Sequence, residues 1–155
     1  MIFQQNQTYS TGVGSHPISV ITNDFNNDNY LDIVIADNVY FLSIIFYGNG
    51  NGLFILKSSL LAESSSLPIT LNAYDFNDDI IVSYTNATYI GLYFGYKNDS
   101  FSQSMKFLTE KKIFSLIAFR DLDKFNFLDM IVGSVFSYSI EIFYENSNEI
   151  FFIND

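Results

Sequence analysis

The stretch that decides the fold is Asp24-Phe25-Asn26-Asn27-Asp28-Asn29-Tyr30-Leu31-Asp32, which runs directly into the apolar segment Ile33-Val34-Ile35-Ala36. Side-chain oxygens recur in it at the first, third, fifth and ninth positions. Calcium takes about six to eight oxygen ligands, and a loop that alternates Asp or Asn with spacers turns every second side chain inward. The spacing therefore predicts a calcium loop that leads into a β-strand.

We expect five residues of this loop to hold the ion, with water completing the shell. They are the side chains of Asp24, Asn26, Asp28 and Asp32 and the backbone carbonyl of Tyr30. An EF-hand is excluded, because the twelfth position from Asp24 is Ile35, where that motif needs a bidentate Glu. The competing interpretation is a solvated loop whose Asp and Asn side chains only form local turns.

Degenerate copies of this loop and strand pattern follow along the chain. Acidic openings recur at Asp75-Phe76-Asn77 and at Asp121-Leu122-Asp123, which gives a period of roughly 50 residues. Each opening is followed by an Asp that begins a short β-branched run, then by an aromatic strand and a turn. A period of this size indicates an array of repeated supersecondary units.

The copies depart from the first loop in different ways. In the second unit Asp79 runs straight into Ile80, so about three loop residues are missing and no chelating loop is expected there. The third unit keeps Asp121, Asp123 and Asp129 but has Phe125 at the position of the third ligand. We therefore expect a weaker second calcium site at Asp121, Asp123 and Asp129.

Each unit reads as four short strands separated by Asn, Asp, Gly or Ser, and signals for helices are almost absent. In the first unit the expected strands are Ile18 to Thr22, Asp32 to Ala36, Leu42 to Tyr47 and Leu53 to Lys57. The second strand of every unit is apolar at consecutive positions, which indicates that both of its faces are covered. Small sheets stacked face to face, as in a β-propeller, satisfy this requirement.

The stretch Asp24 to Ala36, followed by Phe46-Tyr47-Gly48-Asn49-Gly50, resembles the FG-GAP or VCBS repeat, the calcium-bearing blade of integrin-α-like β-propellers. The resemblance covers nearly the whole chain, is close in the first unit and is degraded in the others. It implies an all-β fold, here a β-propeller segment of about three four-stranded blades. It also implies that calcium is structural and that other loops build the partner surface.

The expected division of the whole chain, residues 1–155, follows from these units. It comprises residues 1–11 as the outer strand of a preceding blade and residues 14–58, 67–108 and 113–155 as blades one to three. A usual ring takes roughly four to eight blades. We therefore expect a fragment of a larger ring, an open array, or half of an assembly that self-association completes.

Composition limits the partners. A hydrophobic share of 48% excludes a disordered chain, and 17 acidic against 7 basic residues would repel nucleic-acid phosphates and anionic lipids. No apolar run approaches the roughly 18 residues of a membrane span, so neither nucleic acid nor membrane insertion is expected. The first residues lack a secretory signal pattern, and the absence of cysteine leaves the compartment undecided. The resemblance implies an extracellular or cell-surface location for a longer parent.

Other motifs favour structural interpretations. His16, the one histidine, lies before Pro17 in a Gly/Ser stretch and reads as an exposed loop residue. Asp78 and Asp79 are adjacent, so on a strand they point to opposite faces and cannot act as a glycosidase pair. The run Gly48 to Gly52 reads as a hairpin turn and not as a phosphate loop. Sequons at Asn6, Asn86 and Asn98 would matter only in a secreted parent.

The sequence thus favours a non-catalytic recognition or adhesion module that binds an unidentified protein or glycan. Exposed Tyr side chains at strand ends could stack on sugar rings. Two alternatives stay open. One is an accessory propeller domain of a carbohydrate-active enzyme, and the other is a purely structural scaffold.

Overall fold

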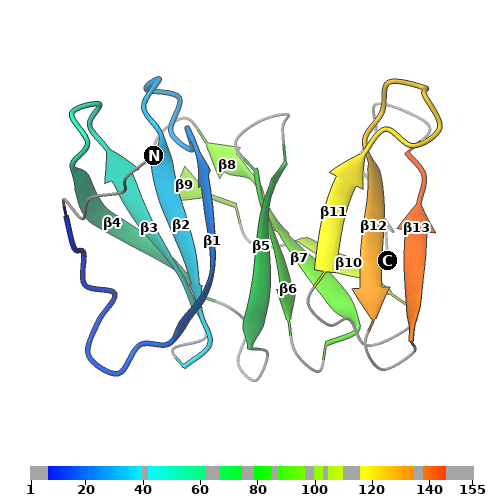
Figure 1. Cartoon of the computed structure of the whole chain (residues 1–155), viewed down its shortest axis with the longest axis horizontal. Helices are drawn as coiled ribbons and strands as arrows, with labels where there is room; N and C mark the ends of the chain where they lie inside the picture. The colour runs from blue at the N-terminus through cyan, green and yellow to red at the C-terminus, as the bar shows by residue number, and fades with distance from the viewer. Residues whose placement is uncertain are drawn as a thin grey trace, which may run out of the picture.

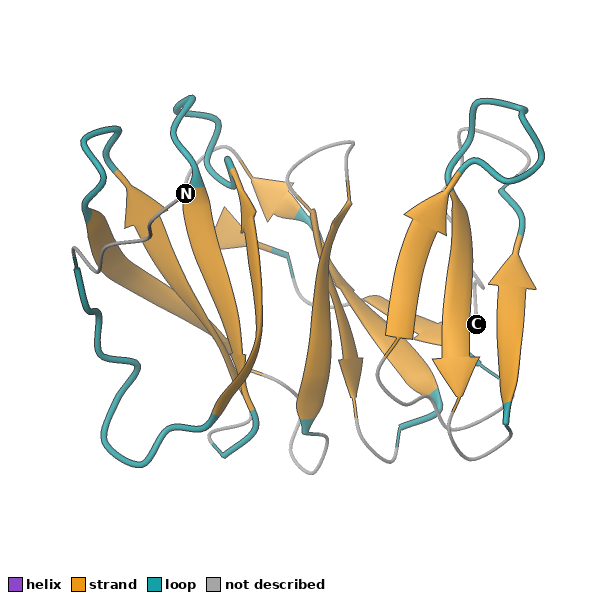
Figure 2. Cartoon of the chain, viewed as in Figure 1, coloured by secondary structure: helices purple, strands orange, loops and turns teal. Residues whose placement is uncertain are grey.

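The computed structural model describes residues 7–39, 42–61, 67–74, 79–84, 87–96, 100–102, 105–109, 116–134 and 138–145. Within these ranges the chain is all-β, as predicted, with antiparallel sheets of four, four and three strands and one two-stranded hairpin. Figure 2 shows strands joined by loops and no helix in the described part. Among these residues there is accordingly no helix long and apolar enough to cross a membrane.

The three sheets follow one another along the chain. The first is β1 (Pro17–Asn23), β2 (Asp32–Asp37), β3 (Leu42–Gly48) and β4 (Phe54–Leu61), paired in that order. The second pairs β5 (Pro68–Tyr74), β6 (Asp79–Tyr84), β7 (Tyr89–Tyr93) and β10 (Met105–Leu108). The third pairs β11 (Leu116–Arg120), β12 (Asp129–Ser134) and β13 (Ser139–Phe143).

The first two sheets contain the four strands that the sequence predicts, whereas the described part of the third contains three. Strand β4 extends to Leu61, beyond the predicted end at Lys57. A hairpin that was not predicted from the sequence lies between β7 and β10 along the chain; it pairs β8 (Gly95–Tyr96) with β9 (Ser100–Phe101). The described residues of the leading stretch, 7–16, form a loop.

The sheets stand side by side, with their first strands innermost (Figure 1). Strand β5 contacts both β1 and β2, and β11 contacts β5. The middle sheet is therefore covered on both faces. Strand β6 is buried at every position, which confirms the prediction from its consecutive apolar residues.

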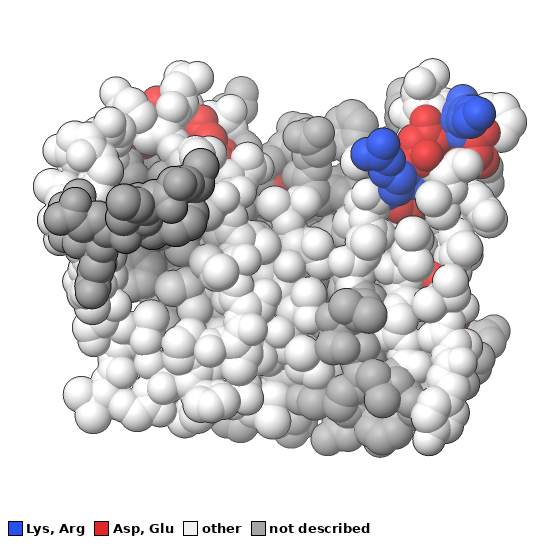
Figure 3. Space-filling view, in the orientation of Figure 1, with Lys and Arg blue, Asp and Glu red and all other residues white. Residues whose placement is uncertain are grey.

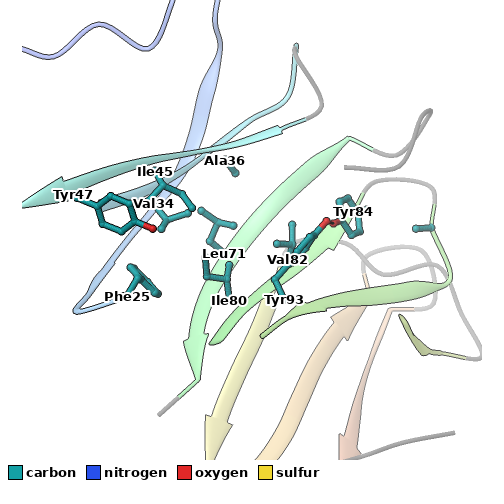
Figure 4. Packing of buried hydrophobic residues seen from close by; sticks show 11 residues of the cluster. Phe25, Val34, Ala36, Ile45, Tyr47, Leu71, Ile80, Val82, Tyr84 and Tyr93 are labelled. Carbon is teal, nitrogen blue, oxygen red and sulfur yellow. Dashed lines mark hydrogen bonds between the residues drawn. The ribbon is translucent and has the colours of Figure 1, made fainter. Parts of the chain in front are cut away.

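The core between the first and second sheets is apolar and aromatic (Figure 4). Two tyrosines within it, Tyr84 and Tyr93, join their hydroxyl groups across 2.7 Å, so neither buried oxygen lacks a partner. The Tyr84 ring leaves no room for a side chain on β7, since a Cβ on Gly91 would lie 2.9 Å from the Tyr84 hydroxyl. Glycine at this position thus follows from packing.

All three sheets face the same way along the stack. The second strand of each sheet begins with an Asp, which is Asp32, Asp79 or Asp129. The first and third residues after this Asp face the preceding sheet. The second and fourth residues after it face the following sheet. Facing forward are Val34 and Ala36 of the first sheet and Ile81 of the second. Facing backward are Ile80 and Val82 of the second sheet and Met130 and Val132 of the third. We call these sides the forward face and the backward face of each sheet.

Candidate metal centre

The loop between β1 and β2 is closed by its own Asp and Asn side chains. The carboxylate of Asp24 accepts the backbone N–H groups of Asp28 at 3.0 Å and Asn29 at 2.7 Å. Asn26 Oδ1 accepts the Asp28 N–H at 3.1 Å, and Asp28 Oδ1 accepts the Tyr30 N–H at 2.8 Å. These Asx-type bonds turn the acidic side chains toward the inside of the loop.

The loop between β11 and β12 repeats this arrangement. Asp121 accepts the N–H groups of Lys124 at 2.6 Å and Asn126 at 3.1 Å, and Asp123 accepts the Phe125 N–H at 3.1 Å. The fourth and sixth residues of both loops have positive φ. They are Asn27 and Asn29 in the first loop and Lys124 and Asn126 in the second. The backbone conformation is therefore preserved although Phe125 has replaced an acidic side chain.

An Asp at the start of the second strand anchors each sheet. Asp32 is buried and accepts the N–H groups of Phe25 and Gly48, both at 2.9 Å. Asp129, also buried, accepts those of Leu122 at 2.8 Å and Glu145 at 3.1 Å. One carboxylate thus fastens the acidic loop to the end of the third strand.

The second sheet has the same anchor. Asp79 is buried and accepts the Gly95 N–H at 3.0 Å, again 16 residues further along the chain. The rest of the second acidic opening, Asp75 to Asp78, lies outside the described residues. Asp32 and Asp129 were predicted only as metal ligands, and Asp79 was given no role, so the anchoring role that all three share was not predicted. An acidic residue at the start of a fully buried strand was the available signal, because a buried carboxylate needs partners.

The third loop gathers three carboxylates that could hold a metal ion. Asp121, Asp123 and Asp129 each offer an oxygen within 4.8 Å of the other two, with Asp129 buried and the others half-buried. Within the described ranges no other set of three His, Asp or Glu is gathered in this way. The loop that was expected to be the weaker site is therefore the one in which three carboxylates gather within this distance.

Charge at the first loop also suits a cation. Burial raises the pKa of Asp32, the N–H groups of Gly48 and Phe25 oppose that rise, and the negative charges of Asp28 and Asp24 add to it. The charged form of Asp32 is thus disfavoured by its surroundings when no cation is near. A divalent ion beside these carboxylates would reverse the repulsion, so the donor set fits an oxygen-seeking ion such as calcium.

His16 ties the leading loop to the end of β2. Its backbone N–H donates to Asp37 Oδ2 at 2.7 Å, and its ring Nδ1 lies 3.0 Å from Asn38 Oδ1. Asp37 is itself fully buried. These contacts give His16 a structural role at the start of β1, whereas the acidic loop follows the opposite end of that strand (Figure 1).

The three sequons fall on Asn6, Asn86 and Asn98, all of which lie outside the described residues.

No protein-family model, curated protein or solved structure matches the chain. The assignment of a metal centre therefore depends on the geometry of the loops alone.

Proposed function

We propose that this chain is a calcium-stabilised, non-catalytic recognition module built as a segment of an FG-GAP/VCBS-like β-propeller. The observation that carries the proposal is the repetition of one loop geometry at the start of β2 and of β12. Two loops that share their backbone conformation and their anchoring Asp differ at most other positions. Both loops keep Asp at their first and ninth positions, and a shared ligand explains why these two carboxylates are retained although Phe125 replaces Asp28 at the fifth position.

In this proposal, calcium would be held in the first loop by Asp24, Asn26, Asp28, the carbonyl of Tyr30 and Asp32. In the third it would be held by Asp121, Asp123 and Asp129. When bound, the ion would supply positive charge that offsets the crowded carboxylates. The chain's own residues do the rest, because Asp32 and Asp129 connect each loop to the end of the third strand of its sheet.

The arrangement supports a scaffold in preference to an enzyme. The described carboxylates of both loops accept backbone N–H groups, which is the chemistry of holding a chain in place. Exposed aromatic side chains lie in the same loops, among them Tyr30 and Phe125. Such side chains offer amphipathic contact area to a protein or to a sugar ring. We propose an extracellular or cell-surface location, where free calcium is abundant enough to fill sites of moderate affinity.

Replacing Asp28 with alanine tests the role of the metal. Calcium at about 100 times its Kd should stabilise the wild-type chain by about 2.7 kcal/mol, or roughly 5–10 °C in Tm, for each occupied loop. The D28A variant should lose the contribution of the first loop. In chelator it should melt within a few degrees of the wild type, because its lost hydrogen bonds are exposed and weak.

A matched control is Asn51→Ala in the turn between β3 and β4. Asn51 Oδ1 accepts the Leu53 N–H at 2.9 Å in an exposed loop that lacks an acidic cluster. This variant should therefore shift Tm equally with calcium and with chelator. If D28A also shifts Tm equally in both conditions, the first loop does not bind calcium.

A further inference from the structure

The forward face of the third sheet is apolar but exposed. Its residues occupy the positions at which the first sheet packs on the second. Ile142 corresponds to Ile45, because each lies 13 residues after the anchoring Asp (142 − 129 and 45 − 32) and pairs with the second residue after it. Tyr144 corresponds to Tyr47, because each lies 15 residues after it (144 − 129 and 47 − 32). Ile45 and Tyr47 are 0% and 4% exposed, whereas Ile142 and Tyr144 are 40% and 51% exposed. The third sheet thus presents half of a sheet-to-sheet contact.

The acidic loop between β11 and β12 also has an apolar side chain exposed on the forward face. Phe25 in the first loop is buried in the core between the first and second sheets, and its ring lies 6.4 Å from that of Phe101 in the β8–β9 hairpin. Leu122 takes the place of Phe25 in the third loop and donates the same backbone hydrogen bond to the anchoring Asp. Leu122 is nevertheless exposed. The loop therefore extends the unpaired apolar surface of the forward face.

The backward face of the first sheet presents the other half of such a sheet-to-sheet contact. Val20 pairs with Ile35 just as Leu71 pairs with Val82, so Val20 holds in β1 the position that Leu71 holds in β5. Leu71 is 3% exposed in the core between two sheets, whereas Val20 is 63% exposed. Ile18, which lies at a register shift at the start of β1, is also exposed.

We infer that two copies of this chain associate head to tail, with the forward face of the third sheet packing on the backward face of the first sheet of the partner copy. The contact continues an interface that the chain already makes twice within itself. The residues named above are apolar on both faces, and Arg120, the last residue of β11, is the charged side chain at the loop end of the forward face. Figure 3 shows charged side chains gathered mainly at the loop edge of the stack. No other partner is needed to supply a matching surface, because each copy carries both halves.

The leading loop leaves this contact open. Tyr9 covers the outer part of the backward face, where its ring lies 5.9 Å from Phe46 and 5.8 Å from Phe54. Inside the chain, however, sheets meet mainly through their innermost strands, as β5 does with β1 and β2. Val20 lies on β1 and is exposed, so it remains available. Two different faces meet in this arrangement, so it gives a closed ring if the rotation closes and an open array if it does not.

Sedimentation velocity on Ile142→Asp and Val20→Asp variants tests the inference. The wild-type chain should form dimers or longer oligomers as its concentration rises. Each single variant should stay monomeric over the same concentrations, because one of the two faces that meet is disrupted in every copy. Because both side chains are exposed, both variants should remain folded, which circular dichroism and thermal unfolding will verify. An equimolar mixture of the two variants should form heterodimers, since one intact forward face then meets one intact backward face.

Three results would overturn the inference. The first is a wild-type chain that stays monomeric at every concentration. The second is a wild-type oligomer that one substitution abolishes and the other leaves unchanged, which indicates like faces meeting. The third is a mixture in which the two variants stay monomeric although each remains folded.

Discussion

Replacing Asp32 with alanine is expected to lower the free energy of unfolding in chelator by about 3–5 kcal/mol. Each hydrogen bond to a charged group contributes about 1.5–3 kcal/mol, and Asp32 accepts two of them from buried or part-buried N–H groups. The substitution leaves the N–H groups of Phe25 and Gly48 without their acceptor. Urea unfolding in chelator measures the loss without any contribution from metal.

The matched variant is Asp79→Ala, which removes the same anchor from the second sheet. Asp79→Ala should destabilise the chain equally with calcium and with chelator, because no chelating loop is expected there. Asp32→Ala should cost more in calcium than in chelator, because it also loses the ion. A loss below about 1 kcal/mol for Asp32→Ala in chelator would show that the carboxylate does not fasten β3 to the loop.

The second large effect is expected at two adjacent residues of the middle sheet. Ile80→Ala and Ile81→Ala should each cost about 2–5 kcal/mol, because each leaves a cavity in a different core. Neighbouring residues on a strand point to opposite faces, so only a strand covered on both sides makes both substitutions costly. Equilibrium unfolding in denaturant gives both values.

Ile55→Ala in β4 is the control, because Ile55 is exposed and the same substitution there should change stability by about 0.5 kcal/mol or less. Equal, small losses at Ile80 and Ile81 would contradict the stacking of three sheets. A large loss at only one of them would mean that the middle sheet has one open face.

Sequence alone was enough to predict the all-β fold and the complete burial of β6. The same prediction was only half right for β2, where Ile33 and Ile35 are half-buried because no described sheet covers their face. Consecutive apolar residues such as Ile80, Ile81 and Val82 cannot all be satisfied by one buried face, so stacking followed from composition and order. The period of roughly 50 residues placed the units. The β8–β9 hairpin was missed because its two strands are only two residues long each and leave almost no pattern.

The acidic loops were harder to predict in detail. Phe125, at the fifth position of the third loop, suggested a degraded loop. The loop is nevertheless closed by Asp121 and Asp123, whose carboxylates accept backbone N–H groups without any help from the Phe125 side chain. Spacing identified Asp32 and Asp129 as acidic loop residues but could not show which N–H groups they meet. One N–H group of each pair comes from the acidic loop itself, and the other comes from the end of the third strand or just after it. The approach of the second group depends on the tertiary register of each sheet.

The central claim is that two acidic loops of this chain bind calcium, and calorimetric titration of the metal-free protein with calcium tests it most directly. We predict saturable binding of about two ions per chain. Asp24→Ala and Asp123→Ala should each remove one of these ions while the protein stays folded. A titration with no saturable heat, accompanied by a melting temperature that calcium leaves unchanged, would contradict the claim.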